Sequence, residues 1–96
     1  MVQRRPVVLA SSEAVVRLPD DVDLHARPAA QFVRTAMRFG ATVEVFANDR
    51  WADAKSLLAV MALGARRGTE LRLSAEGQDA DVALDALATC LAELAE

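Results

Sequence analysis

The chain has 96 residues, an apolar fraction of 53% and a formal net charge of −3 at pH 7. This length supports one compact domain and is too short for two. The acidic balance argues against nucleic acid as a partner, because phosphate backbones select a basic surface. No apolar run approaches the ~20 residues that a membrane-spanning helix needs, so we expect no membrane insertion.

The cysteine content and the N-terminus indicate the compartment. Beyond the basic pair at residues 4–5, only residues 7–9 are a run of large apolar side chains, too short for a secretory signal. The single cysteine, Cys90, cannot form an internal disulfide, which is typical of a reducing compartment. With one histidine and one cysteine, a metal site would depend on scattered carboxylates. We therefore expect a cytoplasmic protein without a metal or cofactor.

The first half of the chain predicts a strand and a helix. Residues 1–12 have a weak pattern, so we expect them to form an extension before a domain at 13–96. Residues 14–18 predict a short strand, which Pro19 and the following acidic residues end. Residues 29–39 predict a helix that Gly40 ends, with Pro28 in its first turn. Its apolar stripe, expected in the core, is Ala29, Phe32, Val33, Ala36 and Met37.

The second half predicts a hairpin, a short helix, a strand and a long helix. Residues 42–46 and 50–54 are strands joined by a turn at Asn48 and Asp49, with Trp51 expected in the core. Residues 56–63 form a short apolar helix, and residues 70–75 a strand that Gly77 breaks. A last helix runs to about residue 95, capped by Asp79 or Asp81. Its expected core stripe is Ala83, Leu87, Cys90, Leu91 and Leu94.

The resulting order is β-α-β-β-α-β-α. Each amphipathic helix needs an apolar sheet face to cover, and short strands linked by tight turns favour antiparallel pairing. The sequence therefore predicts an α+β open-faced β-sandwich, a four-stranded antiparallel sheet with helices packed on one face.

His25, the only histidine, lies directly before the first helix. The start of a helix presents N–H groups without carbonyl partners and a partial positive charge. That environment favours the neutral, nucleophilic imidazole, whereas three aspartates in the preceding loop favour the charged ring, so no net direction is predicted. The N–H groups at Ala26 and Arg27 and the Arg27 guanidinium suit an anion such as a phosphoryl group on the ring.

Two other interpretations of His25 stay open at this point. A histidine in so short a motif commonly caps or packs at the start of a helix. It can also serve as the general base of a hydrolase, which needs a nucleophile and an orienting acid near the ring. The sequence alone does not show whether Ser56 or an aspartate lies near the His25 ring.

Residues 24–30 (LHARPAA), followed by Phe32 and Val33, resemble the active-site motif of HPr, the histidine-containing phosphocarrier of the phosphoenolpyruvate-dependent sugar phosphotransferase system. Residues 54–64 resemble the regulatory-serine segment of that family, and residues 68–77 its last strand and turn. The motifs occur in the family's order and spacing from about Val15 to the C-terminus.

The resemblance implies a specific role for each group. His25 would accept a phosphoryl group on Nδ1 from phosphorylated Enzyme I and pass it to a sugar-specific EIIA component. Arg27 would balance the phosphate charge, and the amides at Ala26 and Arg27 would hold its oxygens. The protein is then a carrier and not an enzyme, and we expect a monomer.

Ser56 precedes the short apolar helix, where serine is a good N-cap. The resemblance makes Ser56 a candidate for regulatory phosphorylation by an HPr kinase/phosphorylase, with a catabolite-control regulator as a candidate partner. The apolar residues of this helix cannot all face inward, and an exposed apolar patch is typical of a partner surface. The residues expected to contact partners are Leu57, Leu58, Met61 and Ala30.

Asp23 departs from the family, which usually has glycine before the Leu-His pair. Glycine adopts backbone angles that aspartate adopts less readily, so we expect a reshaped loop or an altered partner affinity. The alternative among interaction proteins is a Crh-like regulator that acts only through phosphorylated Ser56. Such regulators typically lack the active histidine, so the presence of His25 argues against this alternative.

Overall fold

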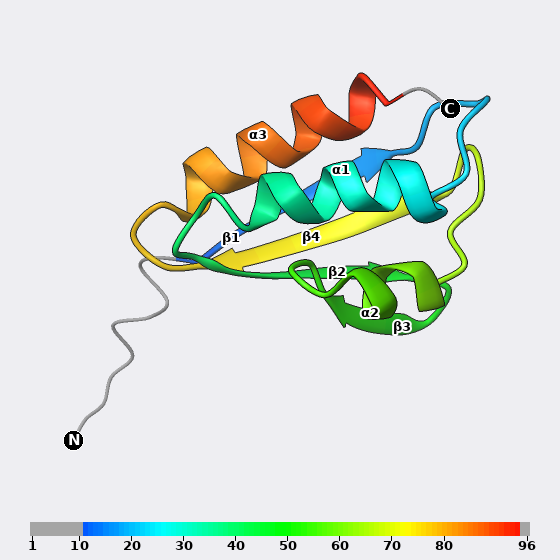
Figure 1. Ribbon diagram of the computed structural model, residues 1–96. Helices are drawn as coiled ribbons and strands as arrows, with labels where there is room; N and C mark the ends of the chain where they lie inside the picture. Colours follow the sequence, from blue (N-terminus) through cyan, green and yellow to red (C-terminus); the bar gives the residue numbers. More distant parts are fainter. Residues whose placement is uncertain (1–10, 95–96) are drawn as a thin grey trace.

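The computed structural model describes residues 11–94, and these residues follow the predicted order of elements (Figure 1). The strands are β1 (Ser11–Arg17), β2 (Thr42–Ala47), β3 (Arg50–Asp53) and β4 (Glu70–Glu76). The helices are α1 (Ala26–Ala36), α2 (Leu57–Ala62) and α3 (Ala80–Ala92). None of the helices within this range has the length and apolar character to cross a membrane.

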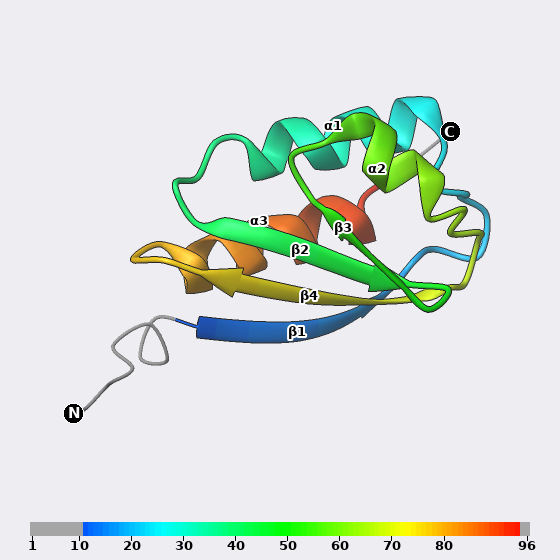
Figure 2. The same cartoon turned by 90° about the horizontal axis from the view of Figure 1, so that it is seen from below.

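The four strands form one antiparallel sheet in the order β1-β4-β2-β3. The helices lie over one face of this sheet and leave the other face uncovered (Figure 2). The central strands alternate accordingly, because the side chains that face the helices are buried and those between them are exposed or half-buried. The predicted open-faced β-sandwich is confirmed.

The β2–β3 hairpin forms at the predicted turn. Asn48 and Asp49 both have positive φ, 53° and 63°. A two-residue hairpin turn of this handedness matches the twist of the flanking strands, and asparagine and aspartate adopt it more readily than most residues. The local sequence therefore fixes the register of these two strands.

The helix α1 begins and ends earlier than predicted. The N–H of Ala29 donates to the carbonyl of His25 at 2.7 Å, which makes Ala26 the first helical residue instead of Ala29. After Ala36, the N–H groups of Arg38 and Phe39 donate to carbonyls three residues back, which tightens the chain out of the α-helix before Gly40. Met37 is consequently 63% exposed, and its assignment to the core is wrong.

Two further core assignments need correction. Trp51 is 51% exposed beside Phe46 on the uncovered face, with ring centroids 4.9 Å apart, and its neighbour Ala52 is the buried residue of β3. A strand pattern of four residues does not reveal which face the helices cover. Cys90 is half-buried and packs against the core from the edge of α3. Leu94, beyond the end of α3, is buried as expected.

The element boundaries at both ends of the domain also shift. β1 begins at Ser11, two residues before the expected domain start, and Leu18 follows the strand as a buried residue. The rest of the expected extension, residues 1–10, lies outside the described residues. The helix α3 ends at Ala92 instead of near residue 95, and Asp79 occupies its N-cap position without a side-chain capping bond.

Candidate functional site

His25 is the N-cap residue of α1. Its backbone is extended (φ −102°, ψ −162°), and its side chain makes no capping hydrogen bond to the helix. The residue is exposed. Both observations argue against a histidine that only caps or packs at the start of the helix.

The first turn of α1 presents backbone donors next to this residue in the chain. The first N–H groups of an α-helix have no carbonyl partner within the helix. In α1 these belong to Ala26 and Arg27, because Pro28 has no N–H and Ala29 already donates to His25. Arg27 is exposed, and its side chain makes no hydrogen bond or ion pair with the rest of residues 11–94. Its guanidinium can therefore bind an anion.

An open depression of about 310 Å³ lies beside His25. Its lining comes from the loop before α1, from Met61 of α2 and from the α2–β4 turn: Asp23, Leu24, His25, Met61, Gly64, Ala65 and Arg66. No hydroxyl or thiol side chain is among these residues, so the depression offers no nucleophile for the hydrolase interpretation. Residues 11–94 also contain no group of three or more histidine, cysteine or carboxylate side chains placed for a metal ion.

The loop before His25 is hydrogen-bonded to the α2–β4 turn at both of its ends. The N–H of Leu18 donates to the Thr69 carbonyl at 2.9 Å, and that of Gly68 donates to Pro19 at 3.1 Å. The N–H of Leu24 donates to Ala65 at 2.9 Å, and both of these residues are buried. The sequence gives no sign of this contribution of the turn, because hydrogen bonds between segments more than 40 residues apart leave no local pattern.

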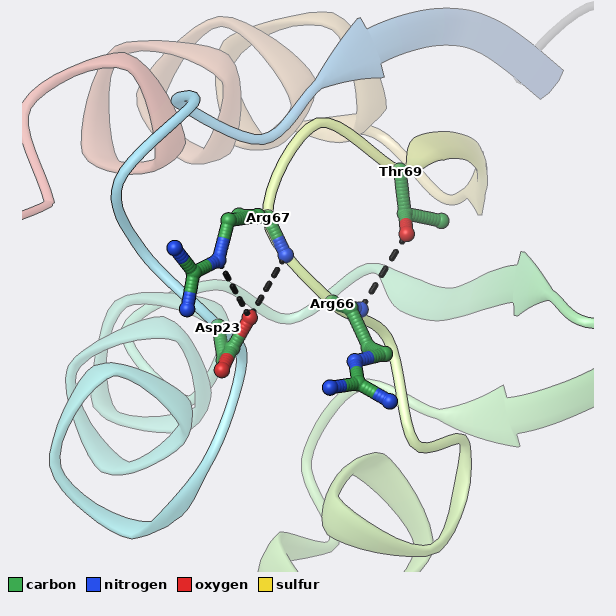
Figure 3. A network of polar contacts seen from close by, with 4 residues as sticks. All are labelled: Asp23, Arg66, Arg67 and Thr69. Atoms are coloured by element: carbon green, nitrogen blue, oxygen red, sulfur yellow. Dashed lines mark hydrogen bonds and ion pairs between the residues drawn. The ribbon is translucent and has the colours of Figure 1, made fainter.

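Asp23 adds a side-chain contact to the same pair of segments (Figure 3). Its Oδ1 accepts the Arg67 backbone N–H at 2.7 Å and lies 3.7 Å from Nε of the Arg67 guanidinium. The hydrogen bond from the Arg67 N–H lowers the pKa of Asp23, and the charges of Arg67, Arg66 and His25 lower it further against an opposing effect of partial burial. Asp23 does not have the positive φ that favours glycine, which among non-glycine residues in 11–94 occurs only at Asn48 and Asp49.

The residue Ser56 caps α2 as predicted. Its Oγ accepts the N–H of Ala59 at 3.2 Å. This satisfies one of the unpartnered donors at the start of a helix of only six residues.

The helix α2 buries Val60 and leaves apolar side chains in solvent. Leu58 is 81% exposed, and Leu57 and Met61 are also exposed. The prediction that part of this helix forms an exposed apolar surface is confirmed. Ala30, in the second turn of α1, is half-buried.

The sequence matches one protein family over most of its length. The family described as "PTS HPr component phosphorylation site" matches residues 12–93. A relative from Lysinibacillus sphaericus, the phosphocarrier protein HPr, is 43% identical over 75 residues, which cover 78% of this chain and 85% of the relative.

Solved structures show the same likeness. The phosphocarrier protein HPr of Bacillus anthracis superposes with a TM-score of 0.81 at 35% identity, covering 85% of this chain and 98% of the other. Crh, the Bacillus subtilis catabolite repression protein, gives a TM-score of 0.68 at 36% identity, covering 97% of this chain and 95% of the other. The Crh structure is described as a domain-swapped dimer.

Proposed function

The chain belongs to the HPr family of phosphocarrier proteins of the phosphotransferase system, and we propose that His25 is the residue that carries the phosphoryl group. The supporting observation is an exposed imidazole at the N-cap of α1, followed by two unpartnered backbone N–H groups and the available Arg27 guanidinium. A helix N-terminus stabilises an anion by these same donors.

The proposed reaction is two successive transfers. The lone pair on Nδ1 of the neutral His25 ring attacks the phosphorus of phosphorylated Enzyme I, and the bond from phosphorus to the donor group breaks with its electron pair. The phosphoryl oxygens then interact with the N–H groups of Ala26 and Arg27 and with the Arg27 guanidinium. An acceptor group of a sugar-specific EIIA component attacks the same phosphorus and releases the unmodified ring. The protein is thus a carrier that is regenerated in each cycle.

The partner surface in this proposal is the exposed apolar side of α2 together with the start of α1. It consists of Leu57, Leu58, Met61 and Ala30, and Met61 shares the depression with His25. Exposed apolar side chains next to a reacting group favour association with a protein partner.

Ser56 is the proposed regulatory site. A phosphate dianion at the start of α2 would interact well with the helix N-terminus, yet it would add charge beside the apolar partner surface. Phosphorylation by an HPr kinase/phosphorylase would therefore weaken docking to an acidic partner surface. It would also create a charged group that a catabolite-control regulator could recognise.

Phosphoryl transfer from phosphoenolpyruvate and Enzyme I tests the main proposal. We expect an acid-labile phosphate on the unmodified protein, none on His25→Ala, and full labelling of Ser56→Ala as the matched control. Arg27→Ala should slow labelling without abolishing it. Absence of labelling with several Enzyme I proteins, or labelling of His25→Ala, would contradict the proposal.

The similarity to Crh supports a second candidate, a regulator that acts through Ser56. An acid-stable phosphate from ATP and HPr kinase, without labelling by Enzyme I, would favour this candidate. Light scattering would test the proposed monomer, because a dimer would double the measured mass.

A further inference from the structure

We infer that the Asp23 carboxylate is a positioning group for phosphoryl transfer, which holds the loop before α1 against the α2–β4 turn and thereby fixes the backbone that carries His25. This inference rests on the proposed carrier role of His25.

The backbone of the loop before α1 contributes to the position of His25. The imidazole makes no capping bond to α1, and the residue is exposed. The backbone N–H of His25 donates to the Asp23 carbonyl at 2.9 Å, so the backbone conformation of Asp23 influences the position of the His25 backbone. The next residue, Leu24, is held by the Ala65 carbonyl and by burial.

Asp23 contributes a second fixed point two residues before the histidine. An N–H group that donates to an ionised carboxylate at 2.7 Å forms a short, charge-assisted hydrogen bond. The lowered pKa of Asp23 shows that the folded protein favours the ionised form of this group. The Arg67 guanidinium adds less, because its Nε is 3.7 Å away and its side chain is 65% exposed. Glycine at this position would have no side chain to form either contact.

Phosphoryl transfer is sensitive to this placement. The reacting nitrogen must approach phosphorus in line with the leaving group, and small displacements of a reacting group reduce rates strongly. Without the Asp23 contact, Leu24 is the only residue next to His25 that remains bonded to the α2–β4 turn, so the His25 backbone gains freedom. Asp23 is not one of the four residues of the proposed partner surface, although it lines the same depression as Met61, so we expect the loss in kcat and not in KM.

The experiment compares three variants in transfer from phosphorylated Enzyme I. Asp23→Gly removes both contacts, and we expect kcat to fall about tenfold while KM stays within about twofold. Asp23→Asn keeps an acceptor oxygen for the Arg67 N–H, and should restore most of the rate. Asp21→Asn is the matched control, because Asp21 is exposed, carries the same charge and makes no hydrogen bond or ion pair within residues 11–94.

Amide hydrogen exchange at Arg67 reports the contact independently of activity. Exchange should be slow in the unmodified protein and in Asp23→Asn, and about tenfold faster or more in Asp23→Gly. An unchanged kcat in Asp23→Gly together with fast exchange at Arg67 would overturn the inference. An equal loss of kcat in Asp23→Gly and Asp21→Asn would also overturn it, since a general charge effect would explain both.

The two proposals fail in different ways. If Enzyme I does not label the unmodified protein, the carrier role is wrong and the positioning role falls with it. If labelling occurs and Asp23→Gly transfers at the unmodified rate, only the positioning role is wrong.

Discussion

Two aspartates at opposite ends of α1 each hold a pair of loops together, but only one lies beside the candidate site. Asp23 precedes the helix and accepts the Arg67 N–H. Asp79 binds the segment that follows the helix, where its two carboxylate oxygens accept the N–H groups of Gly40 at 2.9 Å and Ala41 at 2.8 Å. The two groups use the same chemistry on different backbone segments.

The surroundings of the two aspartates differ in kind. The end at Asp79 is tightly packed: Gly77 has φ +139°, and a Cβ on it would lie 2.9 Å from Cα of Ala41. The end at Asp23 borders an open depression with His25 and two arginines nearby. We therefore expect the contacts at the Asp79 end to contribute mainly to stability, and those at the Asp23 end, beside the open depression, mainly to the conformation around His25.

Gly77→Ala should give the largest loss. The added Cβ meets backbone atoms that cannot move aside cheaply, and the φ angle is one that alanine rarely adopts. We expect the free energy of unfolding to fall by about 2–4 kcal/mol. Urea denaturation measures it. Gly64→Ala is the control, because Gly64 has φ +64° but no neighbouring atom within 4 Å of the added Cβ. Equal losses in the two variants would show that the close contact with Ala41 does not matter.

Asp79→Ala should cost less and leave transfer unaffected. Two N–H groups lose a charged acceptor, and the Ala41 N–H is partly buried, so we expect a loss of about 1–3 kcal/mol in unfolding free energy. The kcat for transfer to His25 should stay at the unmodified value. Asp85→Ala, an exposed residue of α3 without such contacts within 11–94, is the control. A reduced kcat in the folded Asp79→Ala protein would contradict the expectation that Asp79 contributes to stability and not to transfer.

Ser56→Ala removes the N-cap of α2. The loss of the bond from the Ala59 N–H should lower the free energy of unfolding by about 1 kcal/mol. Ser56→Asn retains a capping oxygen and should recover much of it. Thermal denaturation of the three proteins compares them. A Ser56→Ala protein as stable as the parent would mean that the capping bond adds nothing to the packing of Val60 and to the hydrogen bond from Arg50 to the Ala62 carbonyl.

Acidification should remove the smallest contribution, that of Asp23. Its pKa is lowered in the folded state from 3.8, so its stabilising effect is complete well above that value and is lost as the pH falls through the folded-state pKa. The charged groups that face it are Arg67, Arg66 and His25. The stability difference between the parent and Asp23→Asn should therefore shrink as the pH is lowered from about 6 to below 3.8. Urea titrations of both proteins measure this difference, and a constant value over that interval would contradict it.

The sequence predicted most of the fold because its signals are local. Alternating side chains marked the strands, the Asn48–Asp49 turn marked the hairpin, and the apolar stripes marked α1 and α3. The wrong assignments concern residues whose environment depends on distant segments. Trp51 sits on a strand of the right period, but its face of the sheet has no helix above it. Met37 continues a helical spacing after the helix has already ended.

The candidate site divides in the same way. His25, Arg27 and Pro28 lie so close in the chain that the sequence predicts an imidazole at a helix N-terminus, and Ser56 before an apolar run predicts a cap. Asp23 was recognisable from the sequence only as an unusual neighbour. Its contact with Arg67 joins residues 44 positions apart, and the depression beside His25 exists because the α2–β4 turn packs against the loop before α1. Consecutive residues determine which groups lie at a helix N-terminus, because the backbone geometry of a helix is local. Contacts between loops form only when the sheet brings distant segments of the chain together.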